Sequence, residues 1–189
     1  LIIAVSETYD IIVTIPAENT AFEFLATTED RTNSASLYIG NGIKQLKSSQ
    51  PRLKYFEGMK MMNDMMKMNG DLDDIVTLNY AMLKSPNNTS LPKDAPVKEL
   101  KFTLTGNMNR YVWSLDNRVI SETDKILIKK GENVRIVLYN NSMMRHPMHL
   151  HGHDFRLLNG QGANAPLKNV VDIMPMETDT LEFNANVEG

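Results

Sequence analysis

The sequence of 189 residues contains no cysteine. Disulfide bonds, thiolate-bound zinc and cysteine nucleophiles are therefore excluded for this chain. No apolar run approaches the ~20 residues that span a bilayer, so we expect no membrane-spanning helix. The 20 basic residues do not outnumber the 23 acidic ones, and the net charge of -3 argues against a nucleic-acid-binding surface.

Histidine is also scarce, but the few histidines are concentrated. All 4 lie between His146 and His153. Methionine is abundant, and 6 of the 13 methionines lie between Met59 and Met68. Hydrophobic residues make up 42% of the chain, which is enough for a buried core and excludes wholesale disorder. We therefore expect a folded protein whose chemistry lies in two short stretches.

Short stretches rich in β-branched and aromatic residues, separated by turn residues, predict an all-β sandwich or barrel. The region 43–97 lacks this alternation and is predicted to be mostly irregular, whereas Asp116-Asn117 is typical of a tight turn. The strands are expected at 9–15, 22–27, 36–39, 98–105, 111–115, 125–128, 134–139, 170–173 and 178–183.

The segment from His146 to His153 reads His-Pro-Met-His-Leu-His-Gly-His. In an extended chain, His149, His151 and His153 would project from one face, with neighbours roughly 7 Å apart. Neutral imidazole suits zinc, copper, iron and nickel, so this spacing predicts a transition-metal site. A cupin site would need a carboxylate a few residues later, where only Asp154 is nearby. A helical zinc-protease motif is absent.

The same segment, extended to Phe155, resembles the third-domain signature of the multicopper oxidases, in particular their bacterial copper-resistance branch. The similarity continues through the segments 7–13, 140–145, 166–172 and 181–186. The resemblance implies a cupredoxin-like Greek-key β-sandwich for 98–189, truncated before the cysteine-containing copper motif. Residues 1–42 would be the last strands of a preceding cupredoxin domain, and 43–97 a Met-rich linker. The chain is then expected to be an internal piece of a longer protein.

The resemblance also implies a role for each histidine. His146 would bind the type 1 copper, His149 the type 2 copper and His151 one of the paired type 3 coppers. His153 lies outside the usual ligand set and would support the ligands or pack beside them. A type 1 site needs a thiolate, and the trinuclear cluster needs histidines from a first domain. We therefore expect the chain alone to be inactive, with domain 1 and a C-terminal segment of the same protein as its missing partners.

For the parent protein, the resemblance implies coupling of one-electron oxidation of a substrate, phenolic or Cu(I), to reduction of O₂ to water. A role in copper resistance and a periplasmic or exported location would follow. The alternative is a non-catalytic copper-binding or storage module of the cell envelope. A two-domain copper nitrite reductase is a third possibility, which the Met-rich tract and the flanking strands fit less well.

The Met-rich tract between Gly58 and Asn69 has two interpretations. As a helix it would present an adaptable apolar face that packs over a domain interface. As a ligand set, its soft thioethers would bind Cu(I). The possible Cu(I) ligands are Met59, Met61, Met62, Met65, Met66 and Met68.

Replacing these six methionines with leucine distinguishes the two interpretations. Leucine roughly conserves the volume of methionine, so each replacement should lower the stability of the fold by less than ~1.5 kcal/mol. If the tract is a Cu(I) site, the isolated segment should lose Cu(I) binding in a competition assay with a Cu(I) chelator. An unchanged affinity would leave only the packing interpretation.

Overall fold

The computed structural model describes residues 2–15, 19–46, 78–107 and 109–187. Its contacts divide the chain into two units, one of Leu1–Tyr9 with Val76–Gly189 and one of Asp10–Ile75. Within the described ranges, no helix is long and apolar enough to cross a membrane. The predicted boundaries at 42 and 97 stay a prediction, whereas the contacts separate the units near residues 10 and 76.

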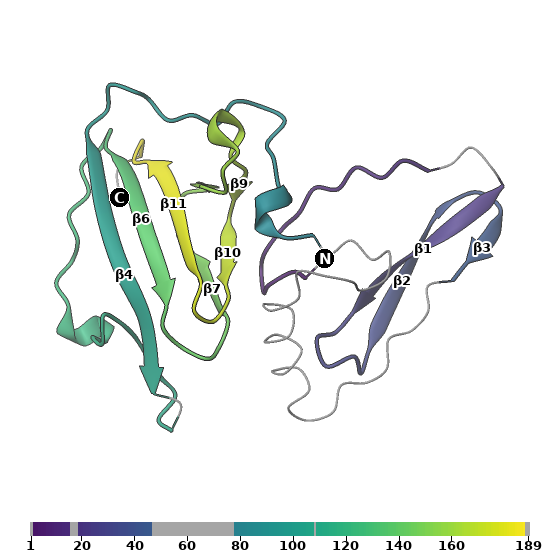
Figure 1. The fold of residues 1–189 in the computed structure, drawn as a ribbon, viewed down its shortest axis with the longest axis horizontal. Helices are drawn as coiled ribbons and strands as arrows, with labels where there is room; N and C mark the ends of the chain where they lie inside the picture. The colour runs from purple at the N-terminus through teal and green to yellow at the C-terminus, as the bar shows by residue number, and fades with distance from the viewer. Residues whose placement is uncertain (1, 16–18, 47–77, 108, 188–189) are drawn as a thin grey trace. The chain divides into compact units, whose positions relative to one another are not determined.

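The smaller unit contains a three-stranded sheet in the order β2-β1-β3 (Figure 1). Strand β1 (Thr20–Thr27) pairs antiparallel with β2 (Ser34–Gly40) and parallel with β3 (Ile43–Gln45). The strand expected at 9–15 is wrong, because this stretch is irregular and the Ile12 side chain is 99% exposed. β-Branched residues favour a strand only where a neighbouring strand accepts their hydrogen bonds.

The larger unit contains a six-stranded sheet in the order β5-β4-β6-β11-β8-β9. Figure 1 shows β4, β6 and β11 side by side, with β4 parallel to β6 and β11 antiparallel to it. Asp116 and Asn117 have φ of 51° and 62°, so the predicted tight turn is confirmed. The strands are β4 (Val97–Asn107), β5 (Val112–Leu115), β6 (Asn133–Asn140), β8 (Phe155–Leu157), β9 (Leu167–Lys168) and β11 (Thr178–Asn184).

A second sheet pairs β7 (His146–His149) with β10 (Val170–Ile173). Its buried Val171 and Ile173 join one apolar cluster with residues of β4, β6, β8 and β11, so the two sheets share a core. The predicted all-β sandwich is confirmed. The strand expected at 125–128 is wrong, since this segment is irregular and Leu127 is 71% exposed. The described part of this unit also contains three short 3₁₀ turns: η1 (Tyr80–Met82), η2 (Ile120–Glu122) and η3 (Gly162–Asn164).

The interior of this unit also holds a carboxylate. Asp179 of β11 has a buried Oδ2 without a hydrogen-bond partner in the described part of the chain. Burial, together with the nearby carboxylates of Glu177 and Asp172, raises the pKa of Asp179 to about 7. Asp179 therefore takes up a proton on folding at pH values where an unfolded aspartate, with a pKa near ~3.9, is ionised.

The replacement Asp179→Asn should change the pH dependence of stability. The folded pKa is raised to about 7, so the favourable contribution is complete below about pH 4 and is lost as pH rises through about 7. Asparagine does not ionise, so the difference in Tm, variant minus wild type, should increase between about pH 5 and pH 8. Glu177→Gln removes a charge that raises the pKa of Asp179, so the loss of stability should occur at lower pH. Equal pH profiles for wild type and Asp179→Asn would contradict this assignment.

Candidate metal centre

The candidate ligands are placed by the pairing of β7 with β10. In this antiparallel register His146 lies opposite Ile173, and His149 lies opposite Val170. Ile173 and Val170 are buried at 0% and 2% exposure, so β10 is a buried neighbouring strand that fixes the position of β7. Pro147 follows His146 and restricts the backbone at the start of β7.

The extended course ends at His149, and His151 and Gly152 form a turn. Gly152 has a φ of +81°, which glycine adopts readily. The rings of His149 and His151 remain neighbours, with centroids 4.8 Å apart. The ring of His153 lies instead 4.9 Å from Phe183, a residue of the core. The expectation that three histidines project from one face is wrong for His153, because the turn interrupts the alternation.

His146 lies apart from this pair and is half-buried. Its ring meets Trp113 edge to face, with centroids 5.1 Å apart. Trp113 in turn covers Gly106, where an added Cβ would lie 2.5 Å from the indole ring. Burial lowers the pKa of His146, and the charge of Asp172 opposes this only in part. The imidazole is therefore neutral near pH 7, which is the form that binds metals.

A buried asparagine determines which nitrogen of His146 carries the proton. The amide of Asn140 is fully buried, and its Nδ2 donates to the carbonyls of Met144 and Ile173 at 2.7 and 3.0 Å. Its Oδ1 must then accept from the Ser142 hydroxyl, 2.7 Å away. The hydroxyl has a single proton, which it donates to Asn140 Oδ1. Its oxygen, 2.7 Å from His146 Nε2, must therefore accept a hydrogen bond from that nitrogen, and Nε2 carries the proton. Nδ1 of neutral His146 is then the unprotonated nitrogen, which is available to bind a metal.

His149 has the opposite arrangement. Its Nδ1 lies 2.7 Å from the backbone oxygen of Asn169, which can only accept, so Nδ1 carries the proton. Nε2 is then the unprotonated nitrogen available to a metal. Both His149 and the neighbouring His151 are exposed. This pair provides two adjacent imidazoles, a donor set that suits copper as well as zinc, iron or nickel.

These histidines do not by themselves complete a metal site. Across the described ranges, no group of three or more histidine or acidic side chains is close enough to hold an ion. The chain also lacks the thiolate that a type 1 copper site requires. The imidazoles of His146, His149 and His151 suit copper chemically, but none of them belongs to a complete coordination shell within the described residues. The six predicted methionine ligands lie outside the described residues.

Sequence reasoning missed the groups that orient the histidines. Ser142, Asn169 and Trp113 touch His146 or His149, but none belongs to the histidine cluster. Asn169 is 20 residues from His149 along the chain, and only the β7–β10 register brings them together. Ser142 could have been found from the Asn-x-Ser spacing that precedes the cluster.

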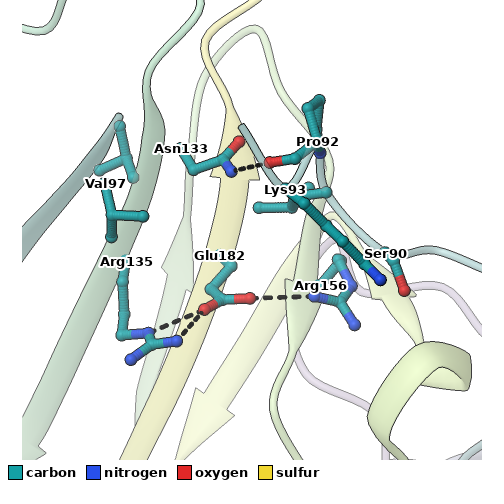
Figure 2. A pocket seen from close by; sticks show the side chains of 10 residues that line it. Ser90, Pro92, Lys93, Val97, Asn133, Arg135, Arg156 and Glu182 are labelled. Carbon is teal, nitrogen blue, oxygen red and sulfur yellow. Dashed lines mark hydrogen bonds and ion pairs between the residues drawn. The ribbon is translucent and has the colours of Figure 1, made fainter. Parts of the chain in front are cut away.

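A cavity of about 240 Å³ lies elsewhere in the larger unit. Figure 2 shows Glu182 between two arginines, with its carboxylate bonded to both. Arg135 contacts Oε1 at 2.6 Å, and the largely buried Arg156 contacts Oε2 at 2.9 Å. Arg156 also donates to the Gly162 carbonyl and to Thr89. The charges of Arg135, Arg156 and Glu182 therefore pair with one another, and this cavity is a weaker candidate site than the histidines.

Comparison with known proteins agrees with the resemblance. A family model described as multicopper oxidase matches residues 94–189, which is just over half of the chain and includes all four histidines. Multicopper oxidase MmcO of Mycobacterium tuberculosis is 25% identical over 94% of this chain and 31% of its own length. Copper resistance protein A of Escherichia coli is 36% identical over 59% of this chain and 18% of its own length.

The chain is also similar to solved structures of multicopper oxidases. The McoA multicopper oxidase from Aquifex aeolicus matches at 19% identity and a TM-score of 0.41, over 82% of this chain and 31% of that chain. This chain spans less than a third of the length of the curated relatives named above.

Proposed function

The chain belongs to the multicopper oxidase family, and on that premise we propose that His146, His149 and His151 are copper ligands of an oxidase. The observation that carries the proposal is the adjacent His149–His151 pair, with centroids 4.8 Å apart and Nε2 of His149 left unprotonated. The family implies copper as the cofactor. The proposed reaction of the parent protein couples one-electron oxidation of a reducing substrate to four-electron reduction of O₂ to water.

Each histidine has a distinct proposed role. His146 would hold the type 1 copper, His149 the type 2 copper and His151 a type 3 copper. Copper at such sites supplies one-electron redox steps and the reduction of O₂. The chain's own contribution is to present neutral imidazoles in fixed orientations, Nδ1 at His146 through Ser142 and Nε2 at His149 through Asn169.

The proposed type 1 ligand His146 and the proposed type 2 ligand His149 lie close together along the chain. Only Pro147 and Met148 separate His146 from His149 along β7. Ligands of the electron-accepting site and of the O₂-reducing site would therefore be joined by a short covalent path. The pairing with β10 keeps this path rigid, because all four residues of β7 have partners there.

The substrate and location are proposed from the relatives' names. Copper resistance proteins A are among the similar proteins, which supports a role in copper resistance with Cu(I) or a phenol as the reductant. A periplasmic or exported location accords with that role. His153 would support the ligands by packing against Phe183. The Met59–Met68 tract keeps open the alternative of a copper-storage module without turnover.

Copper content tests the ligand assignment directly. In the purified copper-loaded protein, His146→Ala, His149→Ala and His151→Ala should each lower the copper stoichiometry measured by atomic absorption. His153→Ala should retain more copper than these three variants, because His153 is outside the proposed ligand set. Thermal melts check that each variant remains folded. Undiminished copper in all three folded ligand variants would contradict the proposal.

The 189-residue chain alone should behave differently from a complete oxidase. Without cysteine it cannot form the copper–thiolate bond that gives type 1 copper its intense colour, so it should be colourless with Cu(II). Copper should bind only loosely through His149 and His151, because two imidazoles do not complete a coordination shell. Absorption spectra and O₂ consumption are the measurements. A thiolate charge-transfer band or turnover would show that the role given to a missing cysteine segment is wrong.

A further inference from the structure

A short segment from the start of the chain is held against the connection between β9 and β10. This N-terminal strap (residues 4–9) is contacted by Lys168, the last residue of β9, and by Asn169, which connects β9 to β10. Asn169 Nδ2 donates to the Ser6 carbonyl at 2.7 Å, and its Oδ1 accepts from the Thr8 hydroxyl at 3.3 Å. Lys168 Nζ donates to the Thr8 carbonyl at 2.8 Å.

The strap is anchored by a buried ion pair. Glu7 Oε1 lies 2.8 Å from Lys168 Nζ, and the two side chains are only 1% and 4% exposed. The same oxygen accepts from the Tyr80 hydroxyl at 2.8 Å, while Oε2 accepts from the Ala4 amide at 2.9 Å. The Lys168 ammonium also lies 3.6 Å from the centre of the Tyr9 ring. A buried pair with its hydrogen bonds satisfied on both sides is costly to disrupt, so the strap is held in one place.

The anchored connection reaches the candidate ligand through a single residue. The backbone oxygen of Asn169 accepts the Nδ1 proton of His149 at 2.7 Å, while the side chain of Asn169 is bound to the strap. On its other side, Val170 begins β10 and pairs with His149. The carbonyl of Asn169 is therefore constrained by the strap and by the sheet.

We infer that Asn169 is a positioning residue for His149 and that the strap is what holds it. The strap fixes the Asn169 carbonyl, which keeps the proton of His149 on Nδ1 and leaves Nε2 free for copper. The copper part of this inference rests on the proposed function, whereas the choice of tautomer does not. Ser6 adopts a φ of +61°, an unfavourable backbone conformation for serine, next to its bond with Asn169.

The variant that tests this inference is Asn169→Ala, which keeps the backbone carbonyl but removes both side-chain bonds to the strap. Asn164→Ala is the matched control. Asn164 is also half-buried, and its Nδ2 donates to the carbonyls of Ser85 and Asn87 at 3.1 and 3.3 Å. It touches no histidine in these contacts. Thr8→Val is a milder second variant that removes only the hydroxyl donor to Asn169.

The first readout needs no copper. The ¹⁵N shifts of labelled histidines in the copper-free protein report which ring nitrogen carries the proton. Wild type and Asn164→Ala should show His149 as the Nδ1–H tautomer alone. Asn169→Ala should show a mixture with the Nε2–H tautomer, and Thr8→Val a smaller admixture. His149 signals that are identical in Asn169→Ala, Thr8→Val and wild type would overturn the inference.

The second readout is the type 2 copper signal in electron paramagnetic resonance, measured during titration with Cu(II) alone. Loss of a residue that orients a ligand costs roughly 10–100-fold in metal affinity, so Asn169→Ala should weaken copper binding at least tenfold. Asn164→Ala should leave the affinity and the hyperfine splitting unchanged. If His149→Ala loses this copper but Asn169→Ala binds it as wild type does, the positioning role is wrong. If wild type binds no copper through His149 and Asn169→Ala still shifts the tautomer, the positioning role stands and the proposed function fails.

Discussion

The antiparallel pairing of β7 with β10 determines where the chemistry of this chain can occur. It fixes His146 and His149 on one four-residue strand, opposite the buried Ile173 and Val170. It also brings the Asn169 carbonyl, which immediately precedes β10, within hydrogen-bond distance of His149. A one-residue slip of this register would move every side chain of β7 to the opposite face. The placement of the candidate ligands therefore depends on the backbone pairing of β7 with β10.

Neutral acceptors orient both imidazoles of β7. The Ser142 hydroxyl accepts a hydrogen bond from Nε2–H of His146, and the Asn169 carbonyl accepts one from Nδ1–H of His149. A carboxylate in either position would favour the imidazolium form, which cannot bind a metal. The Asp172 charge, which acts on His146, is itself paired. Asp172 forms an ion pair with Arg145, and its backbone amide donates to the Tyr80 hydroxyl.

The sequence was most informative where function and local pattern coincide. Four histidines within eight residues marked the candidate site, and clean alternation predicted strands such as 98–105, which lies within β4. The strands expected at 9–15 and 125–128 failed because propensity does not reveal whether a pairing partner exists. The contact between Asn169 and the N-terminal strap was beyond prediction for a similar reason. It joins residues about 160 positions apart, and no local pattern indicates it.

The burial of Asn140 has a consequence for producing this protein. Asn140-Asn141-Ser142 satisfies the Asn-x-Ser rule for N-linked glycosylation, as do two overlapping sequences that start at Asn87 and Asn88. The Asn140 side chain is 0% exposed, and its amide nitrogen already donates to two carbonyls. A glycan there would remove the group that orients Ser142, whereas Asn87 and Asn88 are exposed. In a secretory host, sugar attached before folding would therefore be tolerated at the two loop asparagines but would trap the chain unfolded at Asn140.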